Sequence, residues 1–192
     1  MEKGIGIDPG AAGTVTSRHA TMDTIALALL LLQLGIGLTF AAHGAQKVFG
    51  WWNGPGLAGW QGAMERMGYR PARLFALVSA LIELVGGLLL AAGFLTPIVA
   101  AVLVAQTVVI IGQVHWSNGF FSTRSGFEFP MVLGIGAAAL GLASPTPISV
   151  DAFIGFSVSP SIRVALLIAG ILVGFVTLTI PRVGSHQAPT SA

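Results

Sequence analysis

The stretch RLFALVSALIELVGGLLLAAGF, residues 73–94, decides the fold of this chain. It is long enough to cross a bilayer as a helix, which takes about 20 mostly apolar residues. Its twelve Leu, Ile, Val and Phe residues favour insertion by roughly 5 kcal/mol in sum. One carboxylate, Glu83, lies near the centre and opposes insertion by about 2.5–3.5 kcal/mol. Insertion is therefore favoured, and the stretch is predicted to be a transmembrane helix.

The neighbours of Glu83 indicate which face of this helix is buried. Small residues lie three or four positions away, on the face of Glu83: Ser79, Ala80, Gly86 and Gly87. Leucines occupy the other face: Leu77, Leu81, Leu84 and Leu88. Because small residues let helices approach closely, Glu83 is predicted to point into a helix bundle. An acid at this depth suggests a functional site. The alternative is a neutral, hydrogen-bonded acid that only holds helices together.

The composition supports a membrane protein. Of 192 residues, 54% are hydrophobic and only 8% are charged, which excludes an ordinary soluble domain and any disordered class. This composition makes a lipid bilayer the expected surroundings of the protein. The net charge of +2 comes with no basic cluster, so no nucleic-acid partner is expected. Cysteine is absent, which excludes disulfides, thiolate catalysis and Cys-ligated metals. The four histidines show no metal-site spacing, and no metal is predicted.

The apolar runs predict an all-α integral membrane protein. We expect a four-helix transmembrane bundle plus one extra C-terminal transmembrane helix packed on its outside. The predicted spans are 25–42, 74–94, 97–114, 130–143 and 163–180, with an interfacial amphipathic helix at about 57–67. The predicted organisation is a polar tail (1–23), a four-helix domain (24–151), a loop with the fifth helix (152–180) and a second polar tail (181–192). Gly170 and Gly174 indicate a close helix contact.

The alternation of the helices gathers polar side chains near one membrane face. That face is predicted to hold His43, Lys47, Gln113, His115, Arg124 and Glu128. At about 1.5 Å per residue, three further groups lie roughly 13–17 Å deeper, at one level: Gln33, Glu83 and Gln106. The opposite end of the bundle has almost no polar residue within the predicted helices. The sequence therefore predicts a polar cavity that enters from one face and ends at Glu83.

Three side chains are predicted to carry the chemistry of this cavity: Glu83, His43 and Lys47. His43 and Lys47 are expected at its mouth, where they supply a proton or bind an anion. Counted from the helix ends, both lie too far from Glu83 for a direct pair. Because a charged carboxylate loses its hydration in a low-dielectric environment, we expect Glu83 to be protonated in the resting state.

Several segments resemble the DoxX family over about residues 24–151. They are HGAQKVFG (43–50), GYRPARL (68–74), ELVGGLLLAAGFLTP (83–97), GFE (126–128) and PISVD (147–151). This family is similar to the DoxD subunit of thiosulfate:quinone oxidoreductase, and some members are linked to membrane complexes that handle sulfur and oxidative stress. The resemblance implies a multi-pass protein of the bacterial inner membrane. It also implies that four residues match recurrent polar positions of the family: His43, Lys47, Glu83 and Glu128.

Three hypotheses about function follow from these residues. In the first, the chain is a redox-linked subunit whose cavity binds a quinone headgroup or a small sulfur anion, with Glu83 managing the proton. Since the sequence shows no Cys and no flavin or metal motif, its electrons come from a soluble or membrane oxidoreductase partner or a bound quinone. The second is a small permease or proton pathway that uses Glu83 as the carrier. The third is a structural or assembly protein without catalysis. A homo-oligomer remains open under all three.

Overall fold

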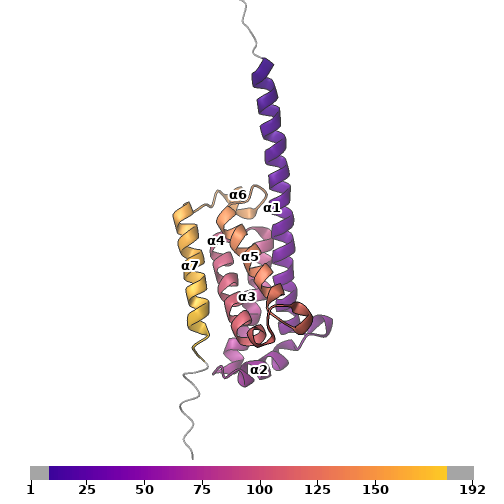
Figure 1. Ribbon diagram of the computed structural model, residues 1–192, viewed down its shortest axis with the longest axis vertical. Helices are drawn as coiled ribbons and strands as arrows, with labels where there is room; N and C mark the ends of the chain where they lie inside the picture. The colour runs from indigo at the N-terminus through magenta and orange to yellow at the C-terminus, as the bar shows by residue number, and fades with distance from the viewer. Residues whose placement is uncertain (1–8, 181–192) are drawn as a thin grey trace, which may run out of the picture.

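A computed structural model describes residues 9–180, and every regular element within that range is helical (Figure 1). A short turn joins α3 to α4, whereas the other connections between the long helices contain the shorter elements, and α6 lies at the end of the bundle opposite α2. The elements are α1 (Pro9–Phe49), η1 (Trp51–Asn53), α2 (Gly56–Arg66), α3 (Ala72–Ala92), α4 (Thr96–Ile110), η2 (Ile111–His115), η3 (Trp116–Asn118), η4 (Ser122–Arg124), α5 (Glu128–Ala143), α6 (Val150–Ile154) and α7 (Pro160–Thr177).

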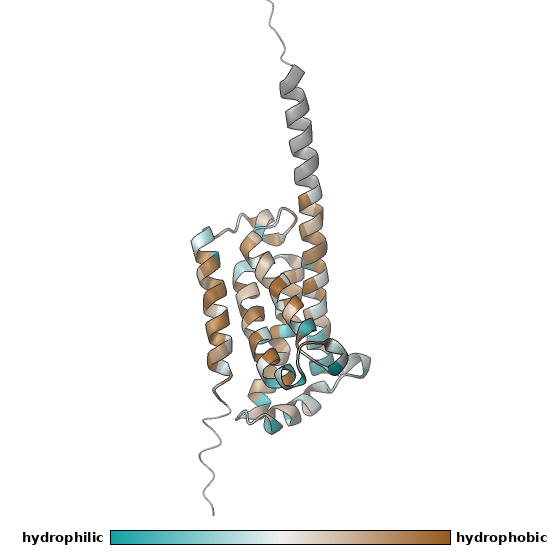
Figure 2. Cartoon of the chain, viewed as in Figure 1, coloured by the Kyte–Doolittle hydropathy of each residue, from teal (hydrophilic) through white to brown (hydrophobic). Residues whose placement is uncertain are grey.

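The helices have the length and apolarity of a multi-pass membrane protein. Within the described residues, four are long and apolar enough to cross a bilayer: Thr24–Phe49, Ala72–Ala92, Thr96–Asn118 and Pro160–Thr177. Helix α5 is apolar but shorter. Hydrophobic residues run along the bodies of these helices, whereas α2 and the loops beside it are more hydrophilic (Figure 2). The predicted fold class, an all-α membrane bundle with an extra C-terminal helix, is confirmed.

Helices α1 and α3 pack antiparallel with their backbones almost in contact. A Cβ added to Gly37 would lie 2.5 Å from the Ala91 nitrogen, and one added to Gly87 would overlap the backbone of Ala41. Gly44 faces Leu84 in the same way. These contacts fix how far α1 is shifted along α3, because no larger side chain fits at any of the three glycines.

The predicted orientation of α3 is confirmed by the burial of its residues. Glu83 and its small neighbours Ser79, Ala80 and Gly87 are buried. The leucines at positions 77, 81 and 88 are exposed on the surface of the bundle. The small face therefore meets other helices, and the leucine face is left for lipid.

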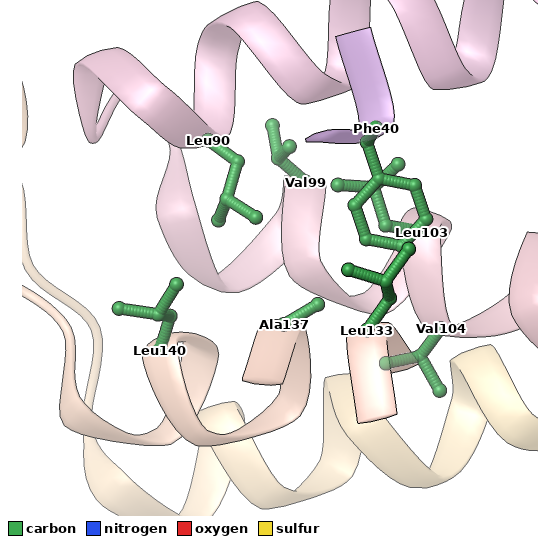
Figure 3. Packing of buried hydrophobic residues seen from close by; sticks show 8 residues of the cluster. All are labelled: Phe40, Leu90, Val99, Leu103, Val104, Leu133, Ala137 and Leu140. Atoms are coloured by element: carbon green, nitrogen blue, oxygen red, sulfur yellow. The ribbon is translucent and has the colours of Figure 1, made fainter. Parts of the chain in front are cut away.

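A hydrophobic core joins four helices into the bundle (Figure 3). Its buried members come from α1, α3, α4 and α5: Phe40, Leu90, Val99, Leu103, Val104, Leu133, Ala137 and Leu140. Helix α7 lies outside, packed mainly on α4. At Gly170 and Gly174, α7 lies against the carbonyl oxygens of Ala101 and Ala105, so the glycine pair makes the predicted close contact within the chain.

Helix α1 is longer at both ends than the sequence predicts. It begins at Pro9, so residues 9–23 of the predicted tail are helical. Proline suits the first turn of a helix, and extending an existing helix is far easier than starting one. At the other end α1 continues past Ala42 to Phe49, because Gly44 and Lys47 still find partners on α3. Residues 1–8 and 181–192, including the predicted C-terminal tail, lie outside the described residues.

The end of the bundle near α6 contains buried polar groups in its loops and helix ends, which the pattern of the predicted spans did not indicate. The Asp151 carboxylate is fully buried and accepts hydrogen bonds from the Leu95 and Thr96 amides, at 2.7 and 2.8 Å. These amides begin α4 and would otherwise lack partners. Arg163 of α7 donates to the carbonyls of Leu142 and Ser144, at the end of α5. These groups fasten the loops to the helix ends, a contact that helical periodicity does not reveal.

The close α1–α3 contact predicts that two glycine substitutions differ in their effect on stability. Gly87→Ala should lower the free energy of unfolding by about 1–3 kcal/mol, because the added methyl meets the α1 backbone, which cannot move independently. Gly35→Ala on α1 is the matched control, since nothing lies within 4 Å of its added Cβ. It should be neutral or stabilising by up to about 1 kcal/mol. Thermal unfolding in detergent tests both, and equal stability of the two variants would contradict this packing.

Candidate functional site

The site is built on an ion pair buried between α1 and α3. Lys47 Nζ donates to Glu83 Oε1. The Glu83 side chain is 1% exposed and that of Lys47 is 14% exposed. Gln106 of α4 donates through Nε2 to the same carboxylate oxygen at 3.3 Å. Three helices therefore meet at one carboxylate, and Gln106, which was predicted to lie at the depth of Glu83, is in contact with it.

The expectation that Lys47 lies too far from Glu83 for a direct pair is wrong in this structure. The prediction counted residues from a helix end at Ala42, whereas α1 continues to Phe49. The glycine contacts then place the last turns of α1 beside the middle of α3, with Gly44 against Leu84. Lys47, one turn further along α1, reaches Glu83.

Helix α2 covers the ion pair through Trp60. Lys47 Nζ lies 4.4 Å from the centre of the Trp60 ring, within the range of a cation–π interaction. The indole Nε1 donates to Ser79 Oγ at 2.7 Å, and Ser79 lies one turn from Glu83 on α3. Trp60 lies in the interfacial amphipathic helix predicted at about 57–67, and helical spacing indicates the apolar face of that helix but not what the face covers.

A cavity of about 170 Å³ lies beside the ion pair. Aromatic rings of Phe40, Trp60 and Phe129 line it, together with the polar side chains of His43 and His115. The His43 and Phe129 rings are 5.6 Å apart, and His115 Nδ1 lies 2.6 Å from the Ser125 carbonyl oxygen. A cavity of about 150 Å³ is large enough to bind benzene. The site therefore has room for one ring-sized molecule with hydrogen-bonding groups beside it.

The other carboxylate oxygen, Glu83 Oε2, is buried and has no hydrogen-bond partner among the described residues. Three more buried polar atoms lack a partner, and they lie at the far end of the bundle: Thr96 Oγ1, Ser144 Oγ and Arg163 Nε. An unpaired charged oxygen is more costly to bury than an unpaired hydroxyl. Glu83 lines the ring-sized cavity, so Oε2 is available to a molecule that enters it.

Four other predicted cavity residues lie elsewhere. Gln33 donates to the Ala91 carbonyl and accepts from Thr146, near the end of α3 away from Glu83. Because α1 and α3 are antiparallel, a residue early in α1 meets the end of α3. Glu128 accepts from the Ser122 amide and hydroxyl, at 3.0 and 2.8 Å, within its own loop. Arg124 is exposed in that loop, and Gln113 lines a separate groove.

Comparison with known families gives one match, over part of the chain. A model of the DoxX family matches residues 28–116. The matched range is a little under half of the chain. It includes the apolar part of α1 and all of α2, α3 and α4, and therefore the ion pair, Trp60 and Gln106. Comparison with curated proteins and with solved structures gives no match. The DoxX match and the four apolar helices together make this a multi-pass membrane protein.

The buried ion pair predicts that its members depend on each other for stability. Lys47→Met and Glu83→Gln should each lower the free energy of unfolding by about 3–5 kcal/mol, because each leaves the other group buried without its partner. The double variant should recover much of that loss. Glu65→Gln is the matched control: this residue is exposed on α2, so its effect should stay within about 0.5 kcal/mol. Unfolding of the wild type, the two single variants and the double variant in detergent measures how strongly the two residues depend on each other. A Glu83→Gln protein as stable as the wild type would mean a neutral Glu83.

Proposed function

We propose that this protein is a redox-linked membrane subunit that binds a quinone headgroup in the cavity beside Lys47 and Glu83. The observation that carries the proposal is the buried, unpartnered Glu83 Oε2 next to a space of ring size, because this oxygen can accept a hydrogen bond from a hydroxyl of the quinol, the reduced form of the ligand. Lys47, His43 and His115 supply hydrogen-bond donors around the same space. A quinone presents carbonyl oxygens, which accept hydrogen bonds, on a flat ring.

The charges of the site favour a neutral ring over a small sulfur anion. Lys47 and Glu83 together carry no net charge, so the pair offers an anion little attraction. The unpartnered oxygen of Glu83 would repel it. Aromatic walls on Phe40, Trp60 and Phe129 suit stacking with a ring rather than solvation of an ion.

Reduction of the bound quinone takes two electrons and two protons and gives the quinol. We assign the electrons to a partner oxidoreductase that oxidises thiosulfate or a thiol, the class suggested by the resemblance to the DoxD subunit. Lys47 donates a proton to one carbonyl oxygen, and a histidine of the cavity donates the second. Glu83 holds Lys47 in place before the quinone arrives. Water then returns protons to Lys47 and the histidine. We place its entry beside His115, whose ring is hydrogen-bonded to the exposed loop residue Ser125.

Binding of a tail-less benzoquinone or naphthoquinone to the full-length protein in detergent tests this proposal. Wild-type protein should bind it, and Lys47→Met should weaken binding about tenfold or more, as expected for the loss of one buried charged hydrogen bond. Glu65→Gln should bind like the wild type because the residue is remote and exposed. Equal affinities of wild-type and Lys47→Met proteins would contradict the proposed headgroup site.

Activity in membranes tests the redox role separately. Membranes that contain this protein and its partners should reduce quinone when thiosulfate or a thiol is added, and a deletion strain should lose that activity. Glu83→Gln should fail to restore it even where immunoblots show normal amounts of the variant. Full restoration by Glu83→Gln would favour a structural or assembly role.

A further inference from the structure

A second, larger cavity lies on the other side of Trp60. This groove has a volume of about 400 Å³, within the range of about 300–1,000 Å³ that is usual for ligand sites. Helix α4 lines its floor with Val102. Helices α3 and α7 line its walls, with Val78 and Val173 respectively. All three valines are exposed, at 42%, 45% and 57%. The groove therefore faces the hydrocarbon of the bilayer along the outside of α4. We call it the α4 groove.

The lining of the α4 groove is apolar and carries no formal charge among the described residues. Its few polar groups are neutral, among them Ser79, Gln106 and Gln113. Tyr69 lies at the end next to α2, and burial raises the pKa of its hydroxyl, so that group also stays neutral. Such a surface suits a long hydrocarbon chain and offers no cation to a phosphate.

The α4 groove and the ring-sized cavity are neighbours, separated by side chains that line both. Trp60, Ile110 and Val114 line both spaces. Gln106 lines the groove and donates to Glu83 Oε1, so one side chain spans from the groove to the ion pair. Trp60 is held on both sides, by Ser79 of the groove and by Lys47 of the cavity. Trp60, Ile110 and Val114 are therefore the side chains that a substituent of a ring beside Glu83 has to pass to reach the groove.

We propose that the α4 groove binds the isoprenoid tail of the quinone, so that the substrate is a long-chain membrane quinone that enters sideways from the bilayer. This inference rests on the proposed headgroup site and adds the substrate class and the route of entry. It assigns a role to α7, which forms one wall of the groove while contributing nothing to the ion pair.

The affinities of a long-tail and a tail-less quinone, measured in the same detergent, test the tail site. Val78→Trp and Val173→Trp fill the groove from its two walls. Each should weaken long-tail binding about tenfold, the equivalent of about two lost methylene contacts, and leave tail-less binding unchanged. Val85→Trp on α3 and Val176→Trp on α7 are matched controls, because both valines are exposed outside the groove lining. Both controls should bind the two quinones like the wild type.

The outcomes separate this inference from the proposed headgroup site. Long-tail binding that depends on Val78 and Val173 but not on Lys47 would support the tail site and contradict the headgroup site. Tail-less binding that depends on Lys47, with long-tail binding insensitive to the tryptophan variants, would overturn the tail site. A phospholipid that stays in the groove through purification and is not displaced by long-tail quinone would also overturn it.

Discussion

The ion pair of Lys47 and Glu83 is the constraint on which the rest of the site depends. Two opposite charges out of water are tolerable only when each holds the other in good geometry. That geometry requires α1 and α3 to be aligned to within a residue or so, and the glycine contacts between their backbones provide the alignment. Trp60 on α2 and Gln106 on α4 then complete the surroundings of the pair. One interaction thus links the four helices of the DoxX match.

The two ends of the bundle use buried polar groups differently. Near α6, Asp151 and Gln33 bind backbone groups and so fasten loops to helix ends. Near α2, Glu83 binds side chains from two other helices and keeps one oxygen free beside a cavity. The first arrangement stabilises the bundle, while the second leaves hydrogen-bonding capacity for another molecule. This contrast is why the proposed function is placed at Glu83.

The sequence predicts the helices and their faces better than their alignment along the membrane. Helical periodicity correctly indicated that Glu83 points inward with Ser79 and Gly87, and the apolar runs located the spans. Periodicity reports direction around a helix axis but not position along it. The placement of Gln33 and Lys47 depended on that position, which glycine-to-backbone contacts between two distant segments decide. Trp60 was missed as a site residue for a similar reason, since the fold-back of α2 over α3 is a tertiary contact.

The charge state of Glu83 is the most direct test of this account. A protonated carboxyl and a carboxylate absorb at distinct infrared frequencies, and the difference spectrum between wild-type and Glu83→Gln protein isolates the band of this one group. The account predicts that the substitution removes a carboxylate band and leaves the protonated-carboxyl region unchanged at neutral pH. Loss of a protonated-carboxyl band would show a neutral Glu83, and the ion pair with Lys47 could not then be the centre of the site.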